Sequence, residues 1–413
     1  MNIEEQKNRM FILMSILLMM VVLAGGFYFA YRALFSEEKK ETPKEDNPVV
    51  VEDDSFNMKI IKEVNKGEKK NYLISPYSIE IALNMLRDGT NGNSKKELDS
   101  LLGKREINYI QAEKRVNVAN GVFIKDSYKE AVLDDYNKII NKNYNGEIVY
   151  DKLETPKVVN EWVNKQTNGM IPKLTDETDP NLIMMLVNAL AIDVDWLSNF
   201  ECNYTSSKEF TKIDGSKYDV SMMKQTFDED AKYFKTDDSK GVILPYKKYG
   251  DSELEFIGIL PNKDAYDYVN KLTSEKINDL YDKSKEVKVV LSLPRFSYDY
   301  EMKDSVKKFQ KLGVKDVFDD SKADLSKMVN AEAFVGSVIH KTHISLNEKG
   351  TKAAAVTAVE ILAKSAPPSG EQPKEISFNK PFVYMIRDKK TKEMLFFGVV
   401  YEPEKWNGST CQK

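Results

Sequence analysis

Apolar and polar positions change period along the chain, from helical spacing early to strand-like runs later. Ile79, Leu83 and Leu86 recur at helical spacing, and Gly89 follows just after the expected helix end. Residues 155–169 predict a second early helix. At the start of that helix we expect Thr155 as the N-cap and Pro156 at the first helical position.

The later apolar runs are rich in β-branched and aromatic residues and are bounded by Pro, Gly or charged residues. They comprise residues 254–261, 287–298 and 394–403, and each predicts a strand. Helices early and strands late are typical of an α+β fold, so we expect antiparallel or mixed sheets.

The N-terminal region carries the longest apolar run. Residues 10–31 hold no charge, and 22 helical residues reach roughly 33 Å, enough to cross a hydrocarbon core of about 30 Å. Cleaved signals have a shorter apolar region, and residues 24–26 offer only a weak cleavage site. We therefore expect an uncleaved transmembrane signal-anchor after a cytoplasmic flank at residues 1–9, with a cleaved signal and a secreted protein as the alternative.

Basic residues flank this apolar run on both sides. They are Lys7 and Arg9 before it, and Arg32, Lys39, Lys40 and Lys44 after it. A positive-inside count alone would place the C-terminal side in the cytoplasm, but long domains translocate largely regardless of such charges. We expect the domain to face outward, in an extracytoplasmic location.

Beyond the apolar run, charge density separates a tether from a folded domain. Residues 36–54 carry 11 charges and two prolines, so residues 32–54 are expected to form a flexible, solvated linker. The remainder contains no repeat and no second linker, which predicts one large domain at residues 55–404 and a short tail at residues 405–413.

Composition excludes several classes of function. A net charge of −4 gives no sign of nucleic-acid binding. The chain has two cysteines, Cys202 and Cys411, and two histidines, His340 and His343, which face opposite sides if they lie in one strand. No GxSxG, HExxH, Walker A or GxGxxG motif is present. We therefore expect no enzyme, no metal site and no cofactor.

A stretch of small residues near the C-terminus has the alternation of a strand. The first set of alternate residues carries no charge: Thr351, Ala353, Ala355, Thr357, Val359, Ile361 and Ala363. The other set carries every charge: Lys352, Ala354, Val356, Ala358, Glu360, Leu362 and Lys364. This separation suits a strand buried on one face, yet Gly and Pro flank the stretch as in a loop. The alternative from this stretch alone is an Ala-rich surface helix.

Nine segments taken together resemble the serpin family. In chain order they are NYLISPYSIEIALNMLRDGTNGN, VANGVFI, VNEWVNKQTNGMIPKL, MLVNALAIDVDWLSNF, VSMMKQ, LSLPRFS, ADLSKM, VIHKTHISLNEKGTKAAA and FNKPFVYMI. They follow the family's order, and the resemblance covers residues 71–403. The resemblance implies three β-sheets, about nine helices, a metastable native state and an exposed reactive centre loop. The Lys- and Asn-rich composition, together with the simple N-terminal membrane anchor, suggests a bacterial member of the family.

The resemblance implies an inhibitor of serine proteases that acts as a suicide substrate. The protease acylates its catalytic Ser on the loop, which then inserts into the main sheet and distorts the protease's active site. We expect a monomer with no cofactor. The alternative is a non-inhibitory serpin-fold module for binding or surface interaction, but the small, uncharged residues at the inward positions favour inhibition.

Site residues carry over from the family one position at a time. Ser75, Ser78, Asn188 and His340 match the polar "shutter" cluster beneath the main sheet, and Trp196 matches the "breach" aromatic where the loop enters. Glu348 is expected to pair with Arg295 beside the hinge. The hinge itself is expected to comprise Glu348, Gly350, Thr351, Ala353, Ala354, Ala355 and Thr357.

The reactive bond is located by counting from the hinge. Relatives usually place the scissile residue 17th when the hinge Glu is the first, which gives Lys364 followed by Ser365. A Lys there favours a trypsin-like protease with an acidic specificity pocket. Counting back from Phe378 leads instead to a position near Gly370, while Leu362 and Ala363 are secondary sites for elastase- or subtilisin-like proteases.

Overall fold

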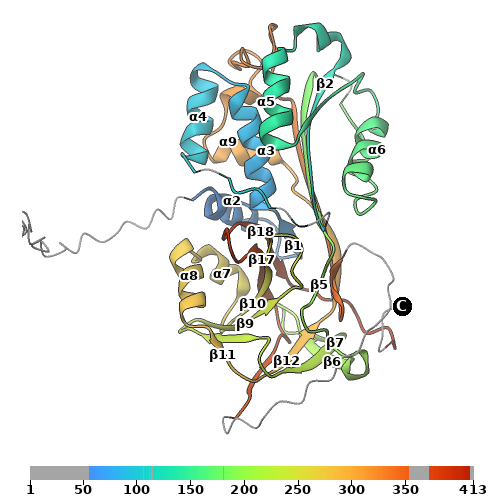
Figure 1. The fold of residues 1–413 in the computed structure, drawn as a ribbon, viewed down its shortest axis with the longest axis vertical. Helices are drawn as coiled ribbons and strands as arrows, with labels where there is room; N and C mark the ends of the chain where they lie inside the picture. Colours follow the sequence, from blue (N-terminus) through green and yellow to red (C-terminus); the bar gives the residue numbers. More distant parts are fainter. Residues whose placement is uncertain are drawn as a thin grey trace, which may run out of the picture. The chain divides into compact units, whose positions relative to one another are not determined.

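The structure is a computed structural model that describes residues 55–105, 107–110, 112, 115–179, 181–352 and 372–409. Within these residues it contains three sheets and eight α-helices (Figure 1). The α-helices are α2 (Phe56–Asn65), α3 (Pro76–Asp88), α4 (Gly92–Leu102), α5 (Asp134–Tyr144), α6 (Lys157–Gln166), α7 (Ala265–Asn270), α8 (Ser274–Asp282) and α9 (Ser305–Lys311). Three short 3-10 helices are η1 (Asp126–Ala131), η2 (Cys202–Tyr204) and η3 (Asp316–Phe318).

The central sheet has the strand order β3-β2-β4-β14-β15-β5, with β13 also paired to β14. Its strands are β2 (Val116–Lys125), β3 (Glu147–Asp151), β4 (Met184–Ile192), β5 (Val194–Asp195), β13 (Phe296–Glu301), β14 (Ser337–Leu346) and β15 (Gly350–Lys352). This sheet receives the first residues of the small-residue stretch, as β15.

The other two sheets contain the remaining strands. The second sheet has the order β1-β18-β17-β10-β9-β8-β11 and comprises β1 (Tyr72–Ile74), β8 (Lys232–Lys235), β9 (Ser239–Pro245), β10 (Leu254–Pro261), β11 (Lys285–Glu286), β17 (Phe382–Asp388) and β18 (Met394–Val400). The four-stranded sheet has the order β16-β12-β7-β6 and comprises β6 (Ser206–Thr211), β7 (Lys217–Phe227), β12 (Val289–Pro294) and β16 (Lys374–Ser377).

The predicted elements are present, with small corrections at their ends. Helix α3 ends at Asp88 with Gly89 as its C-cap, as expected, whereas Pro156, and not Thr155, is the N-cap residue of α6. The strand expected over residues 287–298 is divided at Arg295, because β12 pairs in the four-stranded sheet and β13 pairs in the central sheet. This change of sheet fixes the backbone of Arg295, whose N–H donates to Ser221 O at 2.9 Å.

Strand β4 is buried on both faces of the central sheet, because helices cover both. Its odd-numbered residues, such as Met185 and Val187, pack with Val159 and Val163 of α6. The even-numbered Leu186 belongs instead to the core cluster that contains α3. Figure 1 shows α6 and α5 on opposite sides of β2. A strand whose nine residues are all buried needs no alternation of polar and apolar residues, and β4 pairs along most of its buried length with β14.

Several expectations fall on residues outside the description. Among the described residues no helix has the length and apolar character needed to cross a membrane. The predicted anchor at residues 10–31 and Cys411 lie outside them. No cluster of His, Cys, Asp and Glu suited to a metal ion occurs in the described part of the chain.

Candidate functional site

Strands β4 and β14 pair directly at one end of the central sheet and part at the other. From Ser337 to Thr342, β14 pairs in parallel with β4. Beyond that point β15 lies between the continuations of these two strands. It runs antiparallel to both, with Thr351 opposite Leu346 of β14 and Val194 of β5. The chain thus enters the sheet at Gly350 and extends toward the direct pairing.

Trp196 holds the turn through which β15 enters. Its indole Nε1–H donates to Asn347 O at 2.9 Å, and its backbone N–H donates to Lys349 O at 2.8 Å. The ring is buried and stacks on Tyr246, with centroids 4.4 Å apart and planes 7° from parallel. A large rigid side chain with a satisfied donor suits a fixed entry point.

Gly350 and Thr351 fit the entry point by size and polarity. A Cβ on residue 350 would lie 2.0 Å from Val194 O, so only glycine allows β15 to approach β5 this closely. The Thr351 side chain is fully buried, and its hydroxyl is 2.6 Å from the Tyr246 hydroxyl. The two hydroxyls satisfy each other, and burial raises the pKa of Tyr246 well above its ordinary value.

Arg295 and Glu348 form a buried ion pair beside this entry point. The Arg295 Nε–H donates to both carboxylate oxygens of Glu348, at 2.8 and 3.0 Å, and both side chains are almost fully buried. The Thr205 hydroxyl donates to Glu348 Oε1 at 2.5 Å. The Glu348 carbonyl also accepts from Phe200 N–H at 2.9 Å. The residue before the hinge is therefore fixed by both its side chain and its backbone.

Breaking this ion pair is expected to be costly. Arg295→Met removes the guanidinium and leaves the Glu348 carboxylate buried, with the Thr205 hydroxyl on it, which we expect to destabilise the native state by about 3–5 kcal/mol. The measurement is the midpoint of urea unfolding. The double variant Arg295→Met with Glu348→Gln removes the uncompensated charge and is expected to recover part of the loss. An unchanged midpoint in the single variant would contradict this account.

A polar cluster lies beneath the region where β4 and β14 still pair directly. The Ser75 N–H donates to His340 Nε2 at 3.1 Å, which makes Nε2 the acceptor and assigns the ring proton to Nδ1. His340 Nδ1 then donates to Asn188 Oδ1 at 2.8 Å, and Ser78 Oγ donates to the same oxygen at 2.7 Å. The cluster is fully buried and joins α3, β4 and β14.

Asn120 of β2 extends this cluster, and sequence reasoning missed it. Its Oδ1 accepts from Asn188 Nδ2 at 2.9 Å, and the side chain is 4% exposed. The available signal was one amide residue within the apolar segment VANGVFI, because a buried polar side chain needs a partner. Tyr246 and Thr205, which hold Thr351 and Glu348, were missed as well.

His340 predicts a pH dependence of stability. Burial lowers its pKa to about 3, whereas the unfolded chain titrates near pH 6.5. Between these values the unfolded state binds the proton, so the free energy of unfolding falls with falling pH by up to about 1.4 kcal/mol per pH unit. We expect His340→Gln to reduce the drop in thermal midpoint between pH 7 and pH 5. The same drop in both proteins would contradict this assignment.

The structure places the described site residues in two groups, and the remaining site residues lie outside its description. Trp196, Gly350, Thr351, Arg295 and Glu348 surround the entry point. Ser75, Ser78, Asn188 and His340 form one hydrogen-bonded cluster. Ala353, Ala354, Ala355, Thr357, Lys364 and Ser365 lie outside the described residues.

Comparisons with known proteins agree with this architecture. The family model described as Serpin (serine protease inhibitor) matches residues 52–403, so the chain belongs to the serpin family. An uncharacterized serpin-like protein of Thermococcus kodakarensis is 29% identical over 384 residues, covering 87% of each chain. The leukocyte elastase inhibitor of Xenopus tropicalis is 28% identical and covers 84% of this chain and 97% of its own length.

Solved structures show the same fold. The native state of the thermophilic serpin tengpin matches with a TM-score of 0.74 and 29% identity, covering 86% of this chain and 95% of tengpin. The three sheets and the helices described above are thus the serpin fold.

Proposed function

We propose that this chain inhibits trypsin-like serine proteases by presenting the bond between Lys364 and Ser365 as bait and then inserting the cleaved loop between β4 and β14. One observation carries the proposal: β15 already lies between β14 and β5, antiparallel to both. Further insertion extends an existing strand and nucleates no new one. The names of relatives such as the leukocyte elastase inhibitor support this class of activity.

The strand registers favour insertion without sliding. Where β4 and β14 pair directly, partners such as Asn188 and His340 are 152 positions apart in the chain. Val194 and Leu346, which flank Thr351 on its two sides, are also 152 positions apart. Strands β4 and β14 therefore need only to move apart sideways, without sliding along each other, because an inserted strand would keep the same register to both along its whole length.

This register assigns neighbours to the residues that would enter. Counting on from Thr351, residue 357 falls opposite His340 on one side and Asn188 on the other. Its side chain would share their face, because alternate residues of a strand face the same side. The Thr357 hydroxyl would then meet the polar cluster, where the His340–Asn188 hydrogen bond must open. Ala353 and Ala355 would lie on the same face, and their small side chains would need little space there.

The lengths of β4 and β14 support Lys364 as the scissile residue. By the same count, residue 360 falls opposite Ser337, the first residue of β14, and residue 361 falls opposite Met184, the first of β4. A chain cut after Lys364 would fill the whole length and carry its end just past the sheet. A cut near Gly370 would leave a much longer end beyond it.

The inhibitor is proposed to act as a monomer outside the cell, held by residues 10–31 in the membrane. The support is the uncharged run in the sequence, long enough to cross a bilayer. External protease applied to intact cells is expected to cut the loop. Protection until lysis would contradict the orientation, and a mature chain starting near Phe27 in the medium would favour a cleaved signal and secretion.

The decisive experiment mixes the protein with trypsin and runs a denaturing gel after boiling. We expect a covalent band at the summed mass of the two proteins, because deacylation stalls once the active site is distorted. Trypsin inactivated at its catalytic Ser is the matched control and gives no such band. If active trypsin cuts the loop and leaves no complex, the chain is a non-inhibitory serpin-fold module.

A further inference from the structure

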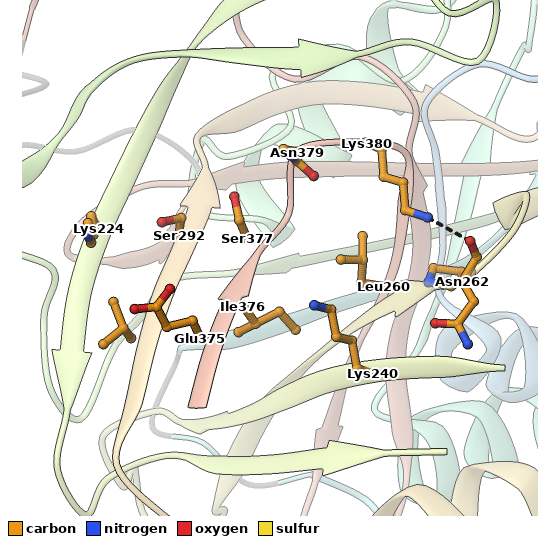
Figure 2. A pocket seen from close by; sticks show the side chains of 12 residues that line it. Lys224, Lys240, Leu260, Asn262, Ser292, Glu375, Ile376, Ser377, Asn379 and Lys380 are labelled. Atoms are coloured by element: carbon orange, nitrogen blue, oxygen red, sulfur yellow. Dashed lines mark hydrogen bonds between the residues drawn. The ribbon is translucent and has the colours of Figure 1, made fainter. Parts of the chain in front are cut away.

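A pocket lies at the junction of the second and four-stranded sheets, and its lining shares no residue with the strand-entry site. Its volume is about 500 Å³, within the range of small-molecule sites. Figure 2 shows side chains converging on it from β7, β9, β10, β12 and β16, and from the segments after β10 and β16. The lining therefore combines two sheets that are otherwise independent hydrogen-bonded units.

Three lysines line this pocket, and no carboxylate of the described residues forms an ion pair with any of them. They are Lys224, Lys240 and Lys380. The Lys380 ammonium donates to Asn262 O at 3.0 Å (Figure 2). Burial, and then the like charge of Lys240, lower the pKa of Lys380. A concave site that gathers three lysines, two of which repel each other, favours a bound anion.

The pocket also has an apolar side and a single carboxylate. Leu260 and Ile376 line it and are almost fully buried, with 5% and 2% of their surfaces exposed. Glu375 is the one acidic residue in the lining, and Figure 2 shows it beside Ser292, on the Lys224 side and away from Lys380. A negative group is therefore favoured near Lys240 and Lys380, with its apolar body against Leu260 and Ile376.

We propose that this pocket binds a small amphipathic anion, a carboxylate, sulfate or sulfonate carried on an apolar body. The negative group is held by Lys240 and Lys380, whose mutual repulsion it relieves. The apolar body covers Ile376 of β16 on one side and Leu260 of β10 on the other.

Such a ligand ties β16 to the second sheet. β16 is an edge strand with four residues, paired in parallel only with β12 among the described strands. It is also the first described strand after residues 353–371. Binding here therefore stabilises the strand that anchors the C-terminal end of that segment. This site is independent of protease inhibition, so either proposal can fail alone.

The test titrates the full-length protein with naphthalene-2-sulfonate by isothermal calorimetry. We expect one saturable site, at least tenfold weaker binding in Lys240→Ala and in Lys380→Ala, and retained binding in Lys240→Arg. Lys208→Ala is the matched control, because Lys208 is exposed on β6, at the opposite edge of the same four-stranded sheet. Equal affinity in the wild type and both pocket alanine variants would overturn the assignment.

Two further probes test the chemical class and the link to β16. Neutral naphthalene-2-sulfonamide and inorganic sulfate are each expected to bind at least tenfold more weakly than the sulfonate. Sulfate binding as tightly would overturn the amphipathic part, and equal binding of the sulfonamide would overturn the anionic part. Bound sulfonate is expected to slow hydrogen exchange of the β16 amides, and unchanged exchange would overturn the link to β16.

Discussion

Thr351→Arg is expected to convert the inhibitor into a substrate. The Thr351 side chain is fully buried beside the Tyr246 hydroxyl at the strand-entry point, so the larger Arg side chain would bring a charge into a buried site. A buried unpaired charge costs several kcal/mol, and each 1.4 kcal/mol changes a rate about tenfold. We expect at least a tenfold rise in the ratio of cleaved protein to trypsin complex, measured by band densities on a denaturing gel.

The matched control for this variant is Lys352→Arg. It places the same guanidinium one position along the strand, where alternation directs it to the opposite face. We expect its ratio of cleaved protein to complex to stay at the wild-type value. Unchanged complex yield in Thr351→Arg would show that Thr351 does not have to remain in the sheet for trapping.

Lys364→Ala is expected to abolish trapping of trypsin while the fold persists. The Lys is the only basic residue between Lys352 and Lys374, and trypsin-like proteases recognise it with an acidic pocket. Losing a group that a polar pocket is built to pair reduces reaction rates by roughly 10⁴-fold. Loss of the boiled complex is the measurement, and Ala363 gives elastase-like enzymes an alternative cut.

Sequencing of the released fragment tests the same bond directly. Cleavage after Lys364 releases residues 365–413, 49 residues that begin SAPPSGEQPK. Lys374→Ala is the matched control, because it removes the next basic residue along the chain, an exposed one on β16, and should leave trapping intact. A fragment starting near Glu371 would move the reactive bond toward the count made from Phe378.

Local patterns in the sequence predicted those parts of the fold that depend on local signals. The apolar spacing of Ile79, Leu83 and Leu86, followed by Gly89, predicted α3 correctly. The run at residues 254–261 matched β10 at both ends. Capping of α6 was less accurate, because Thr155 and Pro156 both suit a helix start and tertiary packing decides between them.

Features that depend on strand partners were outside the reach of the sequence. The division at Arg295 exists because β12 and β13 find partners in different sheets, and the run of residues 287–298 contains no sign of it. Asn120 joins the polar cluster only because its strand register places it opposite Asn188. The ion pair between Arg295 and Glu348, 53 positions apart, came from family resemblance and not from any local pattern.

In the proposed mechanism, the shared register of β4 and β14 gives loop insertion a fixed order in time. Insertion would advance from Lys352, the last residue of β15, and each residue that enters would replace one strand–strand interface with two. Hydrogen bonds per level therefore increase at every step, so the process gains free energy progressively instead of at its end. The position of a substitution in the loop would then decide the stage at which insertion stops. A disruptive substitution at residue 351 would act at the start of insertion, whereas one at residue 357 would stop it about halfway. A half-inserted loop would move the attached protease only part of the way along the sheet. The position of the substitution would therefore decide whether the protease is released early or late.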